Sequence, residues 1–102
     1  MTGSVISEMT EKQRIKNKLV YILRRNGVSK AAIFGSLATG VFNKNSDVDV
    51  LIKFREKKTL LDLAGLRIKL QDSLGRKVDL LTYNSLNPLL KQRILKEQEV
   101  LL

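Results

Sequence analysis

Five residues could carry chemistry in this sequence, and three of them are carboxylates set in apolar runs. Gly35 and Ser36 end one apolar run, ten residues follow, and Asp47 and Asp49 then flank a valine where the next run begins. Asp79 lies between a valine and a leucine in a third run. Close carboxylates raise each other's pKa unless a cation neutralises them, so this spacing points to a charged partner.

The pair formed by Asp47 and Asp49 suits a divalent metal ion. Residues i and i+2 of a β-strand point to the same side, so the two carboxylates project side by side. Their hard oxygen ligands are typical of Mg²⁺ or Mn²⁺ sites. If the strand of Asp79 lies beside theirs, three carboxylates converge and could hold two metal ions, which clamp the attacking and leaving oxygens of a phosphoryl displacement.

The Gly-Ser pair could bind phosphate. Gly35 has no Cβ, so its backbone can approach a ligand closely, and Gly40 provides a second flexible point. Ser36 begins a turn or short helix whose N–H groups can hold phosphate oxygens. A phosphate-binding loop facing metal-binding carboxylates is what nucleotidyl transfer requires, because a hydroxyl must attack the α-phosphorus of a triphosphate whose tail is held.

A purely structural interpretation of these residues is also open. Gly-Ser pairs are common, and Gly3-Ser4 is another one with no acidic pair behind it. An Asp-x-Asp sequence at an exposed strand end is usually only solvated. The apolar setting of Asp79 favours the metal site, but on spacing alone both interpretations remain.

Hydrophobic periodicity predicts the elements that position these residues. Apolar residues recur at three- and four-residue spacing in the helices, and they alternate or run on continuously in the strands. Thr10, Thr59 and Asn87 are capping residues that mark helix starts. The predicted elements are a helix over 11–26, a strand over 31–34, a short helix over 36–39, a strand over 48–54, a helix over 60–74, a strand over 77–81, a helix over 88–97 and a terminal strand over 99–102.

This order predicts a mixed α/β (α+β) domain in which helices pack on one small sheet. Strands separated by helices favour parallel neighbours, whereas the short connection over 41–47 could join an antiparallel pair. The 102 residues fit a single domain over residues 1–102, with residues 1–9 as a loose N-terminal leader. A hydrophobic fraction of 43% supplies its core.

Charge and composition narrow the class of partner. Lys and Arg total 19 against 10 Asp and Glu, and the net charge of +9 favours anionic partners. The basic residues are spread along the chain with few aromatics, which disfavours a dedicated nucleic-acid-binding module. The absence of Cys excludes disulfides and thiolate metal sites and fits a cytoplasmic location. No apolar run approaches the roughly 20 residues of a membrane span.

The combined motif resembles the signature of the DNA-polymerase-beta-like nucleotidyltransferase superfamily, namely Gly35-Ser36, ten residues, then Asp47-Val48-Asp49. The size and the ending KVDLLTYNSLNPLLKQRILKEQEVLL resemble its minimal nucleotidyltransferase branch, and the resemblance covers residues 20–102. That branch consists of small prokaryotic proteins, often antitoxins paired with a HEPN-domain ribonuclease toxin. The resemblance implies the nucleotidyltransferase fold.

The same resemblance implies a role for each residue of the motif. Gly35 and Ser36 would bind the triphosphate of ATP, and Asp47 and Asp49 would be ligands of Mg²⁺ or Mn²⁺. Asp79 would bind the catalytic metal and help to deprotonate the acceptor hydroxyl. The implied reaction is AMP transfer from ATP to a tyrosine of the partner toxin, and the expected assembly is a homo- or hetero-oligomer.

One stretch departs from the family pattern, and two other functions stay open. Members often carry Arg just after Gly-Ser, but residues 37–40 here are Leu-Ala-Thr-Gly, and the cations that could compensate are Lys30, Lys44, Lys53 and Lys77. The first alternative is an antitoxin without catalysis that neutralises its toxin by occlusion. The second is a transferase with a small-molecule acceptor, against which the lack of a second domain argues.

Overall fold

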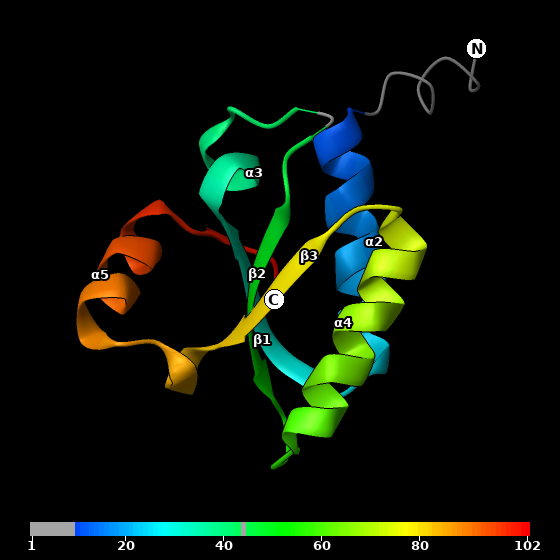
Figure 1. Ribbon diagram of the computed structural model, residues 1–102, viewed down its shortest axis with the longest axis vertical. Coiled ribbons are helices and arrows are strands. Elements are labelled where there is room, and N and C mark those ends of the chain that lie inside the picture. The colour runs from blue at the N-terminus through cyan, green and yellow to red at the C-terminus, as the bar shows by residue number, and fades with distance from the viewer. Residues whose placement is uncertain (1–9, 44) are drawn as a thin grey trace.

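Four strands form one mixed sheet, and helices lie on both of its faces (Figure 1). The computed structural model describes residues 10–43 and 45–102, so the leader predicted over residues 1–9 lies outside the described residues. In chain order the elements are α2 (Glu11–Arg25), β1 (Val28–Phe34), α3 (Gly35–Thr39), β2 (Val48–Phe54), α4 (Leu60–Leu74), β3 (Val78–Thr82), the 3₁₀ turn η1 (Tyr83–Ser85), α5 (Pro88–Glu97) and β4 (Glu99–Val100).

The strand order β3-β2-β1-β4 puts β2 between β1 and β3. β1 runs antiparallel to both β2 and β4, whereas β2 and β3 are parallel. The short α3 and the loop after it therefore join an antiparallel pair, and the long α4 makes the parallel crossover, as the connection lengths predict. The parallel pairing of β2 with β3 sets the register on which the candidate site depends.

Alternation along β2 divides the core between the two faces of the sheet. Val50 is buried with its i±2 neighbours in the cluster that α2 and α4 cover. On the opposite face Leu51 packs with Tyr83 and with Ile94 of α5 in a second, smaller cluster (Figure 1). Asp49 points to the same side as Leu51 because the side-chain period of a strand is two, so the acidic residues lie on the face of α5.

The helices begin where their capping residues predict. Thr10 caps α2 and Thr59 caps α4, each accepting a hydrogen bond from the N–H three residues further on. Asn87 caps α5 ahead of Pro88. The predicted bounds of α4 and α5 are confirmed, and α2 ends one residue earlier than predicted. No helix within residues 10–43 or 45–102 is long and apolar enough to cross a bilayer.

The strand boundaries differ from the predicted ones. β1 begins at Val28 rather than at residue 31, because its pairing with β2 extends through the polar Lys30. β3 lies one residue later than predicted, and η1 has no counterpart in the prediction. β4 comprises only Glu99–Val100, since the N–H groups of the last two residues both donate to the Ala31 carbonyl and end the ladder.

Candidate active site

The parallel register of β2 and β3 places Asp49 directly beside Asp79. Their side chains are close enough to hydrogen bond, which two carboxyl groups do only if one is protonated. Burial, and then repulsion from Asp79, raises the pKa of Asp49 from 3.8 to about 6. Two ionised carboxylates in this position therefore need a neutralising cation.

Asp47 lies just before β2 and adds a third carboxylate to the neighbourhood. Its charge also raises the pKa of Asp49, although less than burial and Asp79 do. Its Oδ2 lies 3.7 Å from Lys77 Nζ, in an ion pair that solvent reaches. Among the described residues, no three acidic side chains are gathered tightly enough to hold a metal ion. The predicted convergence is thus observed for Asp49 and Asp79, while Asp47 faces Lys77.

Gly35 occupies a position that only glycine fits. Its φ is +67°, and a Cβ at this residue would lie 2.3 Å from Asp49 Oδ2. The end of β1 therefore approaches Asp49 through bare backbone, as Phe34 is the cross-strand partner of Asp49. The missing side chain is what allows residues 35 and 36 to lie directly beside this carboxylate.

Ser36 is the second residue of α3, directly after this contact. Phe34, the residue before the helix, provides no side-chain hydrogen bond to its first turn. Because the first N–H groups of a helix lack intrahelical acceptors, those of α3 can donate to a ligand. Gly40 ends the helix with a φ of +89° and donates its N–H to the Ser36 carbonyl.

The sequence of the chain is similar to those of known proteins. The family "Polymerase beta, Nucleotidyltransferase" matches residues 17–102. The chain belongs to this nucleotidyltransferase family. A protein from Methanocaldococcus jannaschii named putative protein adenylyltransferase is 52% identical over 83 residues, which are 81% of this chain and 89% of that protein. The family expected from the motif is therefore confirmed.

Solved structures agree with this assignment. One named as a putative minimal nucleotidyltransferase is 33% identical, with a TM-score of 0.76, and the match covers 91% of this chain and 97% of that one. A crystal structure of a toxin–antitoxin with AMP-PNP matches with a TM-score of 0.77 at 27% identity, over 85% of this chain and 72% of that one. The predicted nucleotidyltransferase fold is confirmed.

Asp49 and Asp79 line a hollow of about 350 Å³ that also contains an arginine. Arg67, from α4, lines this hollow, and its Nε donates to the Val78 carbonyl at 3.1 Å. Periodicity places position 67 at the edge of the apolar stripe of α4, four residues after Leu63 and three before Leu70, but it does not show which strand its side chain reaches. The full lining is Phe34, Asp49, Arg67, Asp79, Leu80 and Leu81.

The lysines proposed to compensate for the missing arginines have other contacts or lie elsewhere. Lys30 Nζ lies 4.7 Å from the centre of the Tyr83 ring, and Lys77 pairs with Asp47. Lys53 is exposed on β2. Lys44 lies outside the described residues. The lysine nearest the carboxylates is therefore Lys77, whose charge opposes the rise in the pKa of Asp49.

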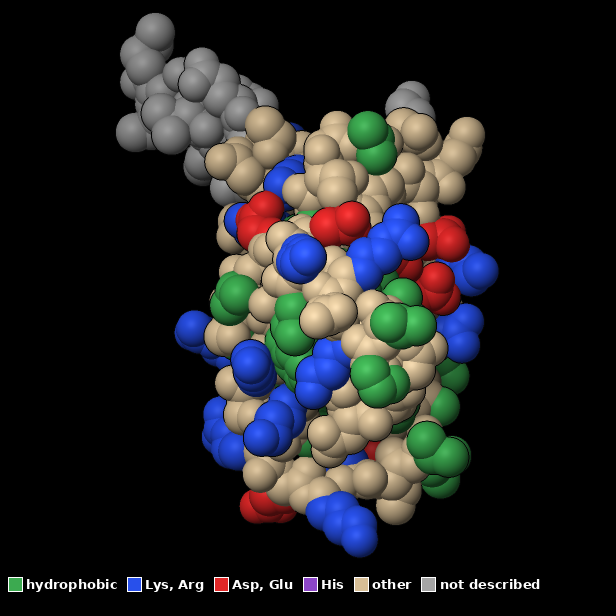
Figure 2. Space-filling view, turned by 90° about the vertical axis from the view of Figure 1, so that its left-hand side faces the viewer, with side chains coloured by type: hydrophobic (Ala, Val, Ile, Leu, Met, Phe, Trp, Pro, Cys, Tyr) green, Lys and Arg blue, Asp and Glu red, His purple; other side chains and the backbone are tan. Residues whose placement is uncertain are grey.

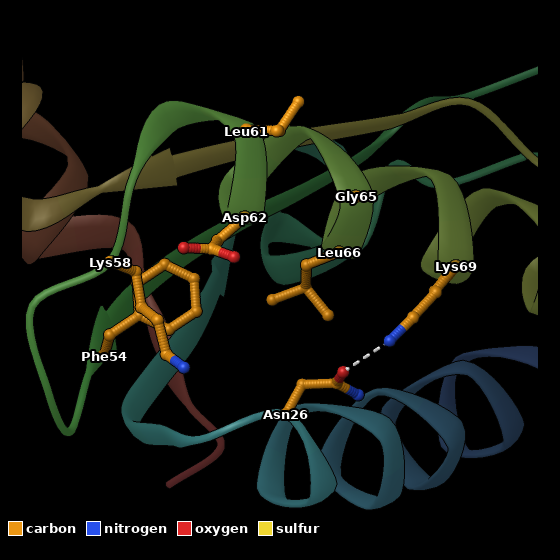
Figure 3. Close-up of a pocket in the computed structure, with 8 residues that line it drawn as sticks. All are labelled: Asn26, Phe54, Lys58, Leu61, Asp62, Gly65, Leu66 and Lys69. Atoms are coloured by element: carbon orange, nitrogen blue, oxygen red, sulfur yellow. Dashed lines mark hydrogen bonds between the residues drawn. The ribbon is translucent and has the colours of Figure 1, made fainter.

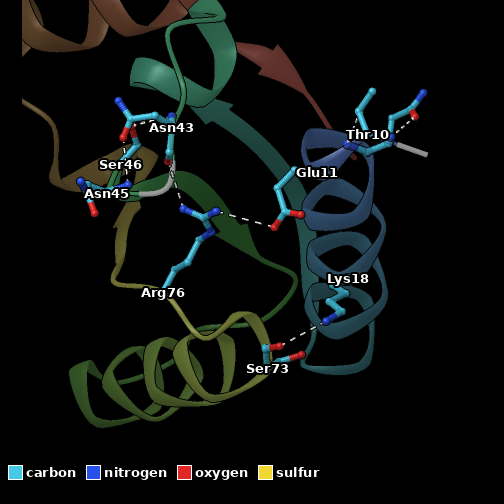
Figure 4. A network of polar contacts seen from close by, with 9 residues as sticks. Thr10, Glu11, Lys18, Asn43, Asn45, Ser46, Ser73 and Arg76 are labelled. Carbon is cyan, nitrogen blue, oxygen red and sulfur yellow. Dashed lines mark hydrogen bonds and ion pairs between the residues drawn. The ribbon is translucent and has the colours of Figure 1, made fainter. Parts of the chain in front are cut away.

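Arg76 holds the loop that leads into Asp47 (Figure 4). Its guanidinium stacks on the Phe42 ring at 4.5 Å and donates to the Asn43 carbonyl at 3.2 Å. It also pairs with Glu11 of α2 at 3.6 Å, and its side chain is only 14% exposed. One arginine thus ties the loop between α3 and β2 to α2.

A second hollow, of about 210 Å³, lies between α4 and the ends of α2 and β2 (Figure 3). It contains Asp62, which accepts from the Thr59 N–H at 2.9 Å as part of the α4 cap. Lys69 Nζ donates to Asn26 Oδ1 at 2.9 Å across it. Hydrogen bonds to Thr59 lower the pKa of Asp62. Asp62 and Lys69 of this hollow have hydrogen-bond partners within the chain, whereas Asp49 lies against a second acid.

Proposed function

We propose that this nucleotidyltransferase transfers AMP from ATP to a hydroxyl of a partner protein, a tyrosine of a HEPN-type toxin, and so acts as its antitoxin. The observation that carries the proposal is the close approach of the Gly35 backbone to Asp49, which the sheet register pairs with Asp79. The names of its matches support it, since one is a putative protein adenylyltransferase and another a toxin–antitoxin with AMP-PNP.

The donor set fits a divalent metal ion. The carboxylates of Asp49 and Asp79 are neighbouring hard oxygen donors, and the pKa of Asp49 is raised first by burial and then by repulsion from Asp79, which a bound cation would relieve. Asp47 could join them by giving up its exposed pair with Lys77. Mg²⁺ or Mn²⁺, when bound, would supply charge neutralisation at the phosphates.

The residues of the site then have separate roles in the transfer of AMP. The backbone at Gly35 and Ser36 holds the triphosphate so that its α-phosphorus faces the carboxylates. Asp79 accepts the proton of the acceptor hydroxyl as its oxygen bonds to the α-phosphorus and pyrophosphate leaves. Near neutral pH the ionised form of Asp49 predominates, because its pKa is about 6.

Incubation with the partner toxin, ATP and Mg²⁺, followed by intact mass measurement, tests this function. The toxin should gain the mass of one or more AMP groups, and Asp79→Asn should abolish the gain. Asp62→Asn, which changes an acid to its amide in the other hollow, should transfer AMP normally. Neutralisation of the toxin with no adduct from the unaltered chain would instead establish the occlusion alternative.

The location and extent of the enzyme follow from the same proposal. We place the reaction in the cytoplasm, because ATP is the donor and the chain has no cysteine that would need an oxidising compartment. We treat residues 1–102 as one nucleotidyltransferase domain, since the family match spans 17–102 and all four strands belong to one sheet.

A further inference from the structure

The charge of the nucleotidyltransferase site is unbalanced for a polyphosphate ligand. Three carboxylates lie at or beside it, and Lys77 is already paired with Asp47. Arg67 lines the hollow of Asp49 and Asp79, where its Nε donates to the Val78 carbonyl, but it does not line the hollow beside Gly35. Residues 37–40, which follow the phosphate-binding Gly35 and Ser36, carry no cation. A triphosphate brings several more negative charges, so its tail needs a cationic side chain from another element.

Arg93 of α5 lies where such a side chain is needed. A hollow of about 180 Å³ next to α3 is lined by Gly35, Arg93 and the carboxylate of Glu97. Phe34 and Leu81 line this hollow and also the larger one that contains Asp49 and Asp79. The two hollows therefore share walls, and Gly35, which lines the hollow of Arg93, lies against Asp49 of the other one.

Helix α5 is fixed in this position by its own sequence. Asn87 Oδ1 accepts from the Leu90 N–H at 2.9 Å, and Pro88 begins the helix. Ile94, next to Arg93, is buried in the cluster with Leu51. These contacts hold the turn that carries Arg93 against the sheet face on which the acidic residues lie.

The guanidinium itself is available to a ligand. Its contact with Glu97 is a same-helix pair in which Nε lies 3.8 Å from Oε1, and both side chains are well exposed. Exposed pairs of this kind contribute little and exchange readily. Figure 2 shows Lys and Arg side chains distributed over this side of the molecule, so the approach of an anion is favoured.

We propose that Arg93 binds the β- and γ-phosphates of the nucleotide and supplies the guanidinium that residues 37–40 lack. The proposal rests on the proposed function, because it takes ATP as the donor. Arg93 would present two N–H groups to one phosphate from α5 while Gly35 and Ser36 present backbone N–H groups from the other side. The tail would thus lie between α3 and α5.

Calorimetry with AMP-PNP and Mg²⁺ tests this assignment. Arg93→Gln removes the charge but retains a good helix former, and it should weaken AMP-PNP binding about tenfold. Arg93→Lys should recover part of the loss, because a point charge replaces a two-pronged donor. Lys91→Gln is the matched control, since Lys91 lies on the same helix but lines neither hollow, and its affinity should stay within about twofold of the unaltered chain.

A comparison with AMP separates the tail from the rest of the nucleotide. The affinity for AMP should be the same in Arg93→Gln and in the unaltered chain, because AMP lacks the two outer phosphates. Equal AMP-PNP affinity in both, or an equal loss for AMP, would overturn the assignment of Arg93. Failure of the unaltered chain to bind AMP-PNP would instead overturn the proposed function, and with it the donor on which this assignment rests.

Discussion

Asp49 and Asp62 are both aspartates that line a hollow beside the same sheet, but their surroundings are opposite. Asp62 is exposed and accepts hydrogen bonds from the N–H and the hydroxyl of Thr59, at 2.9 and 3.0 Å. Those bonds lower the pKa of Asp62. Asp49 is half-buried against Asp79, and burial followed by this repulsion raises its pKa to about 6.

The difference indicates that Asp62 stabilises the fold, whereas Asp49 is in surroundings suited to binding a ligand. Asp62 completes the capping box of α4, so its charge is satisfied within the chain. Asp49 lies beside Asp79, and the charge of Lys77 offsets only part of the effect of burial and repulsion on its pKa, so a cation bound at the pair would stabilise its ionised form. An unfavourable charge of this kind is expected at functional sites, and the stability of the rest of the fold offsets it.

The largest expected effect is on catalysis. Asp49→Asn should lower AMP transfer on the order of a thousandfold, because an amide is a poor metal ligand and leaves Asp79 without its acidic neighbour. Asp62→Asn should leave the rate within about twofold, because its carboxylate serves only the helix cap. The measurement is the rate of adduct formation at saturating ATP and Mg²⁺. Equal rates in the two variants would remove the distinction between the sites.

A second contrast uses two glycines with similar backbone angles. Gly35 has a φ of +67° and Gly75 a φ of +64°, but only at Gly35 would a Cβ meet another residue, Asp49 Oδ2 at 2.3 Å. Alanine at either position should cost about 1 to 2 kcal/mol of stability from backbone strain. Only Gly35→Ala should also displace Asp49, with a loss of activity on the order of a hundredfold. Full activity in folded Gly35→Ala would show that the contact is not required.

The sequence predicted the residues of this site but not their complete surroundings. The period-two pattern of Val48–Phe54 and the length of α4 favoured a parallel neighbour, and the convergence of Asp79 with the other carboxylates was predicted only if their strands were adjacent. The register of β2 and β3 meets that condition and pairs Asp49 with Asp79. The positions of Arg67 and Arg93 relative to the site could not be inferred, because a helical pattern does not show which strand or loop a long basic side chain reaches. Their proximity to the site depends on how α4 and α5 pack on the sheet, which no local pattern records.

The boundaries of the helices and strands also show that local sequence patterns do not record tertiary contacts. The capped helices were predicted almost to the residue, since caps are local chemistry. β1 was predicted three residues too short, because Lys30 is polar and is recruited to the strand only by its partner Lys53 on β2. The ion pair of Lys77 with Asp47 likewise could not be predicted from the sequence, although both residues flank strands that the sequence predicts.

Substitution of Arg76 should have a smaller effect on the activity. Arg76→Met keeps an apolar contact with Phe42 but loses the bond to the Asn43 carbonyl and the pair with Glu11. Stability should fall by about 1 kcal/mol, and the Mg²⁺ concentration for half-maximal activity should rise severalfold as Asp47 loses its fixed position. Lys18→Met is the control, because Lys18 donates to the Ser73 carbonyl at 3.4 Å and does not contact the loop. An unchanged Mg²⁺ requirement in Arg76→Met would limit Arg76 to a structural role.

The smallest effect is on thermal stability, and its sign distinguishes the two aspartates. The pKa of Asp49 is raised in the folded state from 3.8 to about 6, so the unfavourable contribution of its charge appears as pH rises between about 4 and 6. Asp49→Asn removes that charge. In metal-free buffer it should therefore melt a few degrees above the unaltered chain at about pH 7, and the gain should vanish near pH 4.

For Asp62 the signs reverse. Its pKa is lowered on folding, so its stabilising contribution is present above about pH 4 and is lost as pH falls through the folded pKa. Asp62→Asn should accordingly melt below the unaltered chain at neutral pH and approach it in acid. Melting curves across this range, with EDTA present, compare both variants with the unaltered chain. A fall in melting temperature for Asp49→Asn at neutral pH would mean that Asp49, like Asp62, is held by donors within the chain, and the case for a cation at the pair of Asp49 and Asp79 would then be lost.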